Sequence, residues 1–166
     1  VEHYNAVHGA NVEVLGWDYM TQEGLATGDF ENTDNGRAMG ENLMDEGADI
    51  IMPVAGPVGL GTLSVMEERG TGLLVGVDND WSLGNPASAD FILSSVMKNM
   101  DVFVYETIAA LVEGNFEAGN WIGTIENGGV GIAYGSSWVD LIPQELLDEV
   151  AALEAGIIDG SVVTLP

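Results

Sequence analysis

The residues of this sequence best suited to holding a ligand are an aspartate and a lysine at the ends of two apolar runs. Asp78 follows GLLVGV, where a carboxylate has no packing role, and Lys98, the only lysine, follows FILSSV and precedes a helical pattern. A cation at that end of a helix opposes the helix dipole, and such local conflicts are typical of functional positions. A carboxylate accepts two hydrogen bonds from vicinal hydroxyls, and an ammonium donates to a hydroxyl or ring oxygen. The pair therefore predicts an uncharged polar ligand.

Aromatic residues and a glycine turn are the other candidates for this site. Sugar-like ligands often stack on an aromatic face. Phe30, in a glycine-bearing loop, is the leading candidate, followed by Trp17 and Trp81. Gly56, in the turn AGPVGLG, lets the backbone approach a ligand closely. Three of the candidates also have structural alternatives, which are a turn cap for Asp78, a solvated surface position for Lys98 and a hydrophobic plug of its own loop for Phe30.

Enzyme motifs do not appear in the sequence. The histidines, His3 and His8, lack the four-residue spacing of a helical zinc pair, and no G-x-S-x-G motif occurs. The turn GPVGLG lacks the P-loop lysine and the dinucleotide-binding spacing. The run beginning at Asp78 has no glycine at the sixth position of a calcium loop. We therefore expect no catalytic residue, no metal site and no cofactor.

Charge restricts the possible partners. The 166 residues include 27 Asp and Glu but only three Lys and Arg, for a net charge of -24. Such a surface repels phosphate backbones and anionic lipids, so we expect neither nucleic acid nor a membrane surface as partner. Self-repulsion also favours a monomer. A hydrophobic content of 46% indicates a folded domain rather than a disordered chain.

Apolar runs alternate with helical patterns, which predicts an α/β fold with a mostly parallel sheet and flanking helices. The expected strands are 11–17, 49–54, 72–77, 91–96, 121–126, 130–134 and 161–166. The expected helices are 1–10, one capped by Thr33 or Asp34 and running through Asp45, one ending at Arg69, 98–113 and 143–153. In an open parallel sheet, ligands bind beyond the carboxyl ends of the strands, so Gly56, Asp78 and Lys98 should share one edge.

Four runs in this order and spacing resemble the basic membrane protein family, namely GADIIMPVAGPVGLG (47–61), GVDNDW (76–81), SSVMKNMDVFVYE (94–106) and NGGVGIAY (127–134). Members of this family are extracytoplasmic lipoproteins that serve as binding components of ABC importers, best known for purine nucleosides. The segment from Pro143 onward resembles the family's C-terminal helix and strand. The resemblance covers nearly all of the sequence.

The resemblance implies the type I periplasmic-binding fold, in which two α/β lobes close on a ligand at their hinge. Residues 1–166 would form one α/β unit that corresponds to the C-terminal lobe plus the hinge crossings, with the N-terminal lobe and the lipid-bearing cysteine outside this sequence. Helix 98–113 would pack on that N-terminal lobe. The implied localisation is extracytoplasmic and lipid-anchored, and the implied partner is an ABC permease.

The same resemblance assigns roles to single residues. Asp78 matches the family's ribose-binding aspartate, and Lys98 matches its ribose-contacting lysine. Phe30 matches an aromatic residue that stacks on the base, and Gly56 matches a turn that lines the pocket. Met52-Pro53 stands where relatives often have an aromatic and a polar residue, which leaves the base preference open.

The sequence thus predicts a solute-binding component of an ABC importer that holds a nucleoside, in particular a purine nucleoside, between two lobes without catalysis. Three alternatives stay open. The ligand is a simple sugar or riboflavin, or the chain is an α/β enzyme that acts on nucleosides through Asp78 and Asp80, or it is a sensor module without a transport role.

Overall fold

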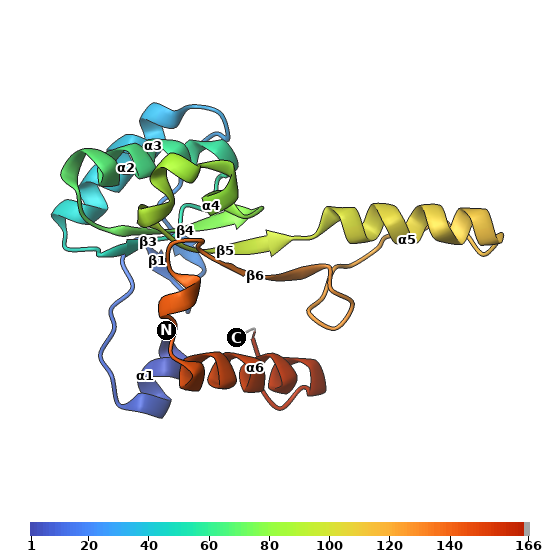
Figure 1. The fold of residues 1–166 in the computed structure, drawn as a ribbon. Helices are drawn as coiled ribbons and strands as arrows, with labels where there is room; N and C mark the ends of the chain where they lie inside the picture. Colours follow the sequence, from blue (N-terminus) through green and yellow to red (C-terminus); the bar gives the residue numbers. More distant parts are fainter. Residues whose placement is uncertain (165–166) are drawn as a thin grey trace.

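A four-stranded sheet with helices on both sides forms the body of the molecule, and one helix extends away from it (Figure 1). The structure is a computed structural model and describes residues 1–164. The strands are β1 (Trp17–Asp18), β2 (Glu23–Gly24), β3 (Ile50–Ile51), β4 (Leu73–Asp78), β5 (Ile92–Lys98) and β6 (Val130–Tyr134). The α-helices are α1 (Glu2–His8), α2 (Thr33–Asp45), α3 (Gly59–Arg69), α4 (Trp81–Gly84), α5 (Met100–Glu113) and α6 (Gln144–Asp159). Short 3-10 helices are η1 (Gly56–Val58), η2 (Pro86–Phe91) and η3 (Val139–Leu141).

The main sheet has the strand order β3-β4-β5-β6. The first three strands are parallel and β6 runs antiparallel to β5, which confirms the predicted α/β fold with a mostly parallel sheet. β1 and β2 form a separate antiparallel pair. Within residues 1–164, no helix has both the length and the apolar character that a membrane span needs.

The core lies between the sheet and the helices α2, α3 and α4. It is a cluster of buried hydrophobic side chains contributed by three strands and two helices, namely Ile51, Leu63, Met66, Leu74, Trp81 and Ile92. β3 supplies only Ile51 because its ladder with β4 covers two residue pairs. The strand expected at 49–54 thus forms only at Ile50–Ile51. Pro53, two residues further on, has no N–H with which to continue the ladder.

Glycines allow α2 and α3 to pack closely. A side chain at Gly36 would overlap the carbonyl of Val58, and one at Gly61 would overlap the carbonyl of Thr33. Thr62 uses the short distance between the helices to donate a hydrogen bond of 2.9 Å to the Gly36 carbonyl. This contact places the first turn of α2 beside the first turn of α3, at the edge of the sheet where β3 ends.

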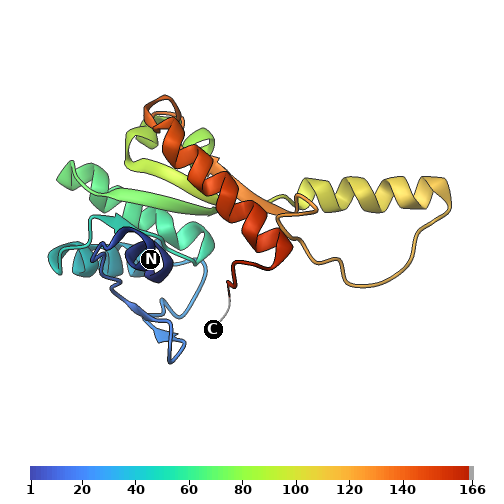
Figure 2. The same ribbon diagram turned by 90° about the horizontal axis from the view of Figure 1, so that it is seen from below.

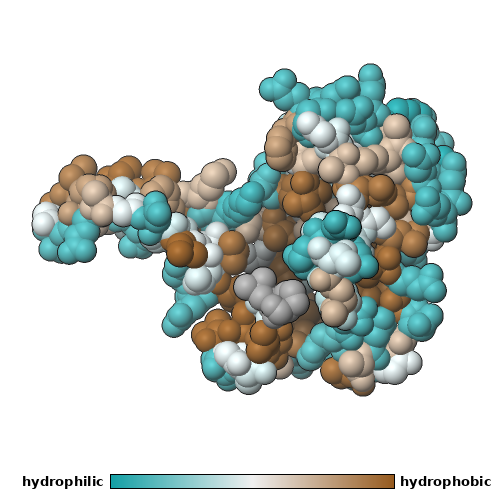
Figure 3. Space-filling model, turned by 180° about the vertical axis from the view of Figure 1, so that it is seen from behind, coloured by the Kyte–Doolittle hydropathy of each residue, from teal (hydrophilic) through white to brown (hydrophobic). Residues whose placement is uncertain are grey.

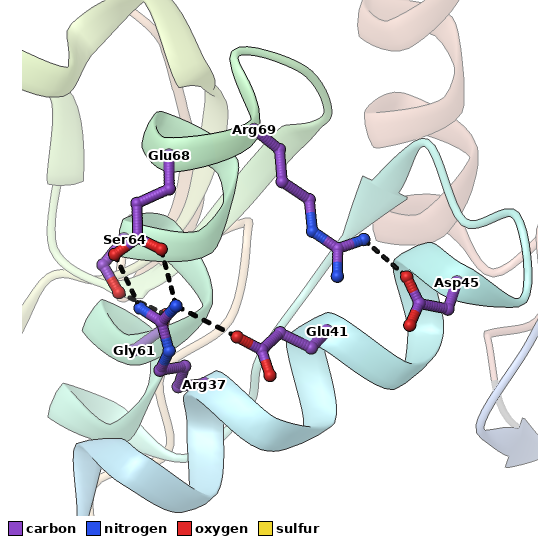
Figure 4. A network of polar contacts seen from close by, with 7 residues as sticks. All are labelled: Arg37, Glu41, Asp45, Gly61, Ser64, Glu68 and Arg69. Carbon is purple, nitrogen blue, oxygen red and sulfur yellow. Dashed lines mark hydrogen bonds and ion pairs between the residues drawn. The ribbon is translucent and has the colours of Figure 1, made fainter.

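Two arginines join the exposed sides of the same helices (Figure 4). Arg37 donates two hydrogen bonds to the Glu68 carboxylate, at 2.8 and 2.6 Å, and lies 3.0 Å from Glu41. Arg69 pairs with Asp45 at 2.7 Å. The hydrogen bonds from Arg37 lower the pKa of Glu68, and they outweigh the opposing effect of burial.

α1 and α6 lie on the other side of the sheet, where α6 crosses beneath the strands (Figure 2). His8 at the end of α1 contacts Glu149 on α6, with 2.6 Å between Nε2 and Oε1. α6 begins after Pro143 as predicted, but it continues past Leu153 to Asp159, because a left-handed residue appears only at Gly160 (φ 81°).

α5 projects from the body as an arm (Figure 1). The whole helix is described, and none of its residues is buried. It ends at Gly114 (φ 78°), as the sequence predicts. Its expected start at residue 98 is wrong, because β5 continues past 96 to Lys98 and α5 begins at Met100. Figure 3 shows hydrophobic side chains along this arm. Ile108 and Leu111 are among the exposed hydrophobic residues of α5.

The expected strand 121–126 is wrong, and of the expected strand 11–17 only Trp17 lies in a strand, because nearby side chains occupy the backbone groups of both segments. The amide of Asn5 binds both the N–H and the carbonyl of Val12, so 11–16 forms no ladder. The Asn127 amide does the same for Ile122 and Thr124 within 121–126. The expected strand 161–166 does not form over residues 161–164, and 165–166 lie outside the described residues. The predicted cap of α2 is also wrong, since Asn32 accepts the bond from the Asp34 N–H.

Substituting Gly61→Ala tests the close contact of α2 and α3. The added methyl group overlaps the Thr33 carbonyl, so we expect a loss of about 1–3 kcal/mol in the free energy of unfolding, as for other overpacked sites. Gly84→Ala is the matched control, because a Cβ there meets no described atom within 4 Å. Urea denaturation measures both, and equal stability of the two variants would contradict the close contact.

The Arg37–Glu68 pair predicts a pH dependence. The pKa of Glu68 is lowered from its ordinary 4.5, so the ionised pair stabilises the fold above that value, and this contribution is lost as the pH falls through the folded-state pKa. We expect Glu68→Gln to lower the urea midpoint at pH 7 and to approach the parent below about pH 4. Glu13→Gln is the control, since Glu13 makes no ion pair within residues 1–164. A gap between Glu68→Gln and the parent that stays constant from pH 7 to 3 would contradict this reading.

Candidate ligand-binding site

The carboxyl ends of the parallel strands bring the predicted site residues to one edge of the sheet. β4 ends at Asp78 and β5 ends at Lys98, and the ladder between them places Asp78 opposite Met97. The chain leaves the end of β3 through Pro53 and reaches Gly56 at the start of η1. These three positions come from separate strands, and the edge they share is the one expected for a ligand in an open parallel sheet.

Asp78 and Lys98 form an ion pair at this edge. The Lys98 Nζ lies 2.6 Å from the Asp78 Oδ1, while 67% and 40% of the two side chains are exposed. The prediction that these two groups lie together is therefore confirmed. The other two basic side chains, Arg37 and Arg69, pair within the α2–α3 surface. Among the described residues, Lys98 is thus the one lysine or arginine that the fold brings to the strand ends.

The backbone at Asp78 is strained. Its φ is 72°, and the Asn79 N–H donates to the Val77 carbonyl at 2.9 Å, which closes a γ-turn around Asp78. A positive φ is costly for a residue with a Cβ, and it persists where the surroundings impose it, often at functional sites. The turn aims the carboxylate off the end of β4. The cap of α4 is Asp80, which accepts a bond of 2.9 Å from the Ser82 N–H, so Asp78 does not serve as that cap.

Trp81 supports this turn from inside the fold. It is only 6% exposed, its indole N–H donates to the Val77 carbonyl at 2.9 Å, and its ring lies against Gly59 and Gly76. Its backbone N–H donates to the Ser95 hydroxyl on β5. The ring was expected to offer an aromatic face to a ligand, but the structure gives it a packing role, because only glycines leave space for it beneath β4.

Phe30 and Gly56 lie near the same edge. Phe30 precedes α2, whose first turn packs against the start of α3, and 70% of it is exposed. This exposure does not fit a plug of its own loop. Asp29 holds the loop by accepting bonds from the N–H groups of Glu31 and Asn32, and these bonds lower the pKa of Asp29. Gly56 has a φ of 54°, and a Cβ there would meet no described atom within 4 Å.

A hollow of about 320 Å³ lies beside Lys98. Sequence reasoning missed the residues that line it, since most come from the segments after β5 and before β6, and they include Asn99, Phe103, Trp121 and Gly129. The rings of Phe103 and Trp121 are 5.3 Å apart. Trp121 was missed because 121–126 was expected to be a strand. The Asn127 side chain holds this segment as a loop, and the loop places Trp121 beside Phe103. Across residues 1–164, no three His, Cys, Asp or Glu side chains are grouped as metal ligands.

Most of this chain matches a known protein family and a named relative. Residues 25–160 match the Bmp family, described as ABC transporter substrate-binding protein PnrA-like. Basic membrane protein A1 of Borrelia garinii subsp. bavariensis is 30% identical over 142 residues, which cover 82% of this chain and 40% of that protein. The chain therefore spans less than half the length of this relative.

Two solved structures share the fold. The ABC transporter solute-binding protein of Aeropyrum pernix K1 superposes with a TM-score of 0.76 at 23% identity, covering 98% of this chain and 50% of that one. A transcriptional activator of the comK gene from Bacillus halodurans superposes with a TM-score of 0.69 at 18% identity, covering 82% of this chain and 46% of that one. At these identities the likeness establishes the α/β fold alone.

The exposure of the ion pair predicts how little it adds to stability. We expect Lys98→Met to change the free energy of unfolding by less than about 1 kcal/mol, as for other exposed pairs. Asp78→Gly should match or exceed the parent, because glycine relieves a strain of about 1–2 kcal/mol. Asp80→Ala, which removes a helix cap, should cost about 1 kcal/mol. Urea denaturation at pH 7 measures all three, and a loss above 2 kcal/mol for Lys98→Met would assign the lysine a structural role.

Proposed function

The chain belongs to the Bmp family of PnrA-like ABC-transporter substrate-binding proteins, and on this premise we propose that its carboxyl edge forms one half of a nucleoside-binding site. The observation that carries the proposal is the exposed ion pair of Asp78 and Lys98 on a strained turn. An exposed ion pair contributes little to the free energy of folding, and the strained backbone at Asp78 costs free energy. We therefore infer that the two side chains are held at this edge in order to bind a ligand.

The chemistry of the pair suits a ribose. The Asp78 carboxylate accepts from the 2′ and 3′ hydroxyls, and the Lys98 ammonium donates to a hydroxyl or the ring oxygen. Phe30, exposed at the same edge, would stack on the base, and Gly56 lets the backbone approach the ligand. A purine offers the larger face for such stacking. No step of bond making or breaking is assigned to these residues.

A second lobe is proposed to complete the site. The exposed apolar side chains of α5 supply a surface that this lobe would cover, and the chain spans 50% of the solute-binding protein from Aeropyrum pernix. In this proposal, residues 1–166 are the C-terminal lobe with hinge crossings, and ligand binding closes the two lobes. The closed form would then be recognised by an ABC permease outside the cytoplasm, with the protein held at the membrane by a lipid anchor.

Calorimetry on the chain joined to its N-terminal lobe tests the ligand. We expect heat with adenosine, guanosine or inosine, and none with ribose or riboflavin. Asp78→Ala should weaken nucleoside binding by about 2–4 kcal/mol, since two hydrogen bonds to a charged group are lost. Asp140→Ala, at an exposed position of η3, is the control.

Three outcomes would contradict the proposal. The absence of heat with all three nucleosides would reject the ligand class, and heat with riboflavin or ribose would replace it with one of the alternatives. A loss below tenfold for Asp78→Ala would show that this carboxylate faces away from the ligand.

A further inference from the structure

The α5 arm is joined to the body through two neighbouring backbone segments. The chain enters the arm at Asn99, directly after β5, and returns at Gly129, directly before β6 (Figure 1). All of α5 is described and none of its residues is buried, and near the base of the helix the ring of Phe103 packs against Trp121 of the returning segment, with 5.3 Å between the ring centroids. No buried face of this fully described helix anchors the arm to the sheet, so contacts between these segments hold it in place. Its orientation relative to the sheet depends on the geometry of these two segments.

Asn99 bonds the two segments together. Its backbone N–H donates to the Gly129 carbonyl at 2.9 Å, and its side-chain amide donates to the Gly128 carbonyl at 2.8 Å. Asn99 stands at the N-cap of α5, where an asparagine ordinarily accepts a bond from the first turn of its own helix. In the described structure it makes no such bond. The amide instead serves a contact across 29 positions of sequence.

The acceptor side of this contact is built to keep its shape. The Asn127 Oδ1 accepts from the N–H groups of Thr124 and Gly129, at 2.8 and 3.0 Å, and its Nδ2 donates to the Ile122 carbonyl at 2.9 Å. A side chain at Gly129 would overlap Gly123 and the Trp121 ring. The carbonyls that face Asn99 are therefore held by a compact turn.

Lys98 lies next to this contact. The β5–β6 ladder ends with the pair of Lys98 and Val130, and the two bonds of Asn99 continue the connection one residue further. The backbone of Lys98 is thus held by the β5–β6 ladder up to this residue and by the bonds of Asn99 directly after it. These contacts determine how the Lys98 side chain is directed toward Asp78.

We propose that Asn99 is a positioning residue that locks the two segments of the arm together and thereby holds the Lys98 ammonium at the Asp78 carboxylate. The part of this inference that concerns ligand affinity rests on the proposed function. The part that concerns the arm does not, and it can be tested without ligand.

The sequence makes a spectroscopic test direct, because it contains no cysteine. Leu83→Cys on α4 and Val112→Cys on α5 are both at exposed positions, and a spin label on each reports the distance between body and arm. The test variants are Asn99→Ala and Asn99→Asp. Asn115→Ala is the control, since Asn115 follows α5 at the far end of the arm and its side chain makes no hydrogen bond within residues 1–164.

Asn99→Asp separates the two roles that this residue could have. Aspartate is as good an N-cap as asparagine, so α5 still begins normally, but its carboxylate has no N–H to donate to Gly128. We expect one narrow distance distribution for the parent and for Asn115→Ala. In both Asn99 variants, the population with the parent distance should fall about fivefold relative to the populations with other distances. This is the change expected when one hydrogen bond is lost.

A second measurement follows Lys98 itself. Because Lys98 is the only lysine, reductive methylation with carbon-13 gives one lysine signal beside that of the N-terminal amine. This signal should move toward that of the Asp78→Asn variant in both Asn99 variants and stay unchanged in Asn115→Ala. Parent-like distances and a parent-like lysine signal in Asn99→Asp would overturn the proposal. Changed distances with no nucleoside heat would support it while rejecting the proposed ligand.

Discussion

Parallel pairing of β4 with β5 is the interaction on which the candidate site depends. The two strands are neighbours in the sheet and run in the same direction, so their last residues, Asp78 and Lys98, emerge together. Trp81 imposes the strained backbone at Asp78. Its indole N–H donates to the Val77 carbonyl, and its backbone N–H donates to the Ser95 hydroxyl on β5. Shifting the register by one residue would reverse the face of every side chain and separate the pair.

The lysine and the two arginines of this strongly acidic chain form ion pairs at two different places in the fold. Arg37 and Arg69 neutralise carboxylates on α2 and α3, where glycines have already brought the helices close. These pairs are exposed, so the close packing carries more of the stability than the charges do. Lys98 is placed where it stabilises little. It pairs with Asp78 at the exposed ends of β4 and β5.

The α5 arm and the body are governed by different forces. The body is held by a core between the sheet and one layer of helices. The arm exposes its apolar side chains, and hydrogen bonds at Asn99 and Asn127 define its base. In the proposed function, the second lobe covers these exposed apolar side chains of α5.

The sequence by itself determined the order of β3 to β6 with the helices α2, α3, α5 and α6, the ends of α3 and α5 at Gly70 and Gly114, and the placement of Asp78 at the end of a strand. These features follow from local periodicity and from glycine's tolerance of positive φ. Only the tertiary structure decided that Trp81 is buried, that 121–126 is a loop, and that Asn99 binds Gly128. Each of those outcomes depends on a hydrogen-bond partner or a cavity supplied elsewhere in the fold, and a local pattern carries no information about such partners.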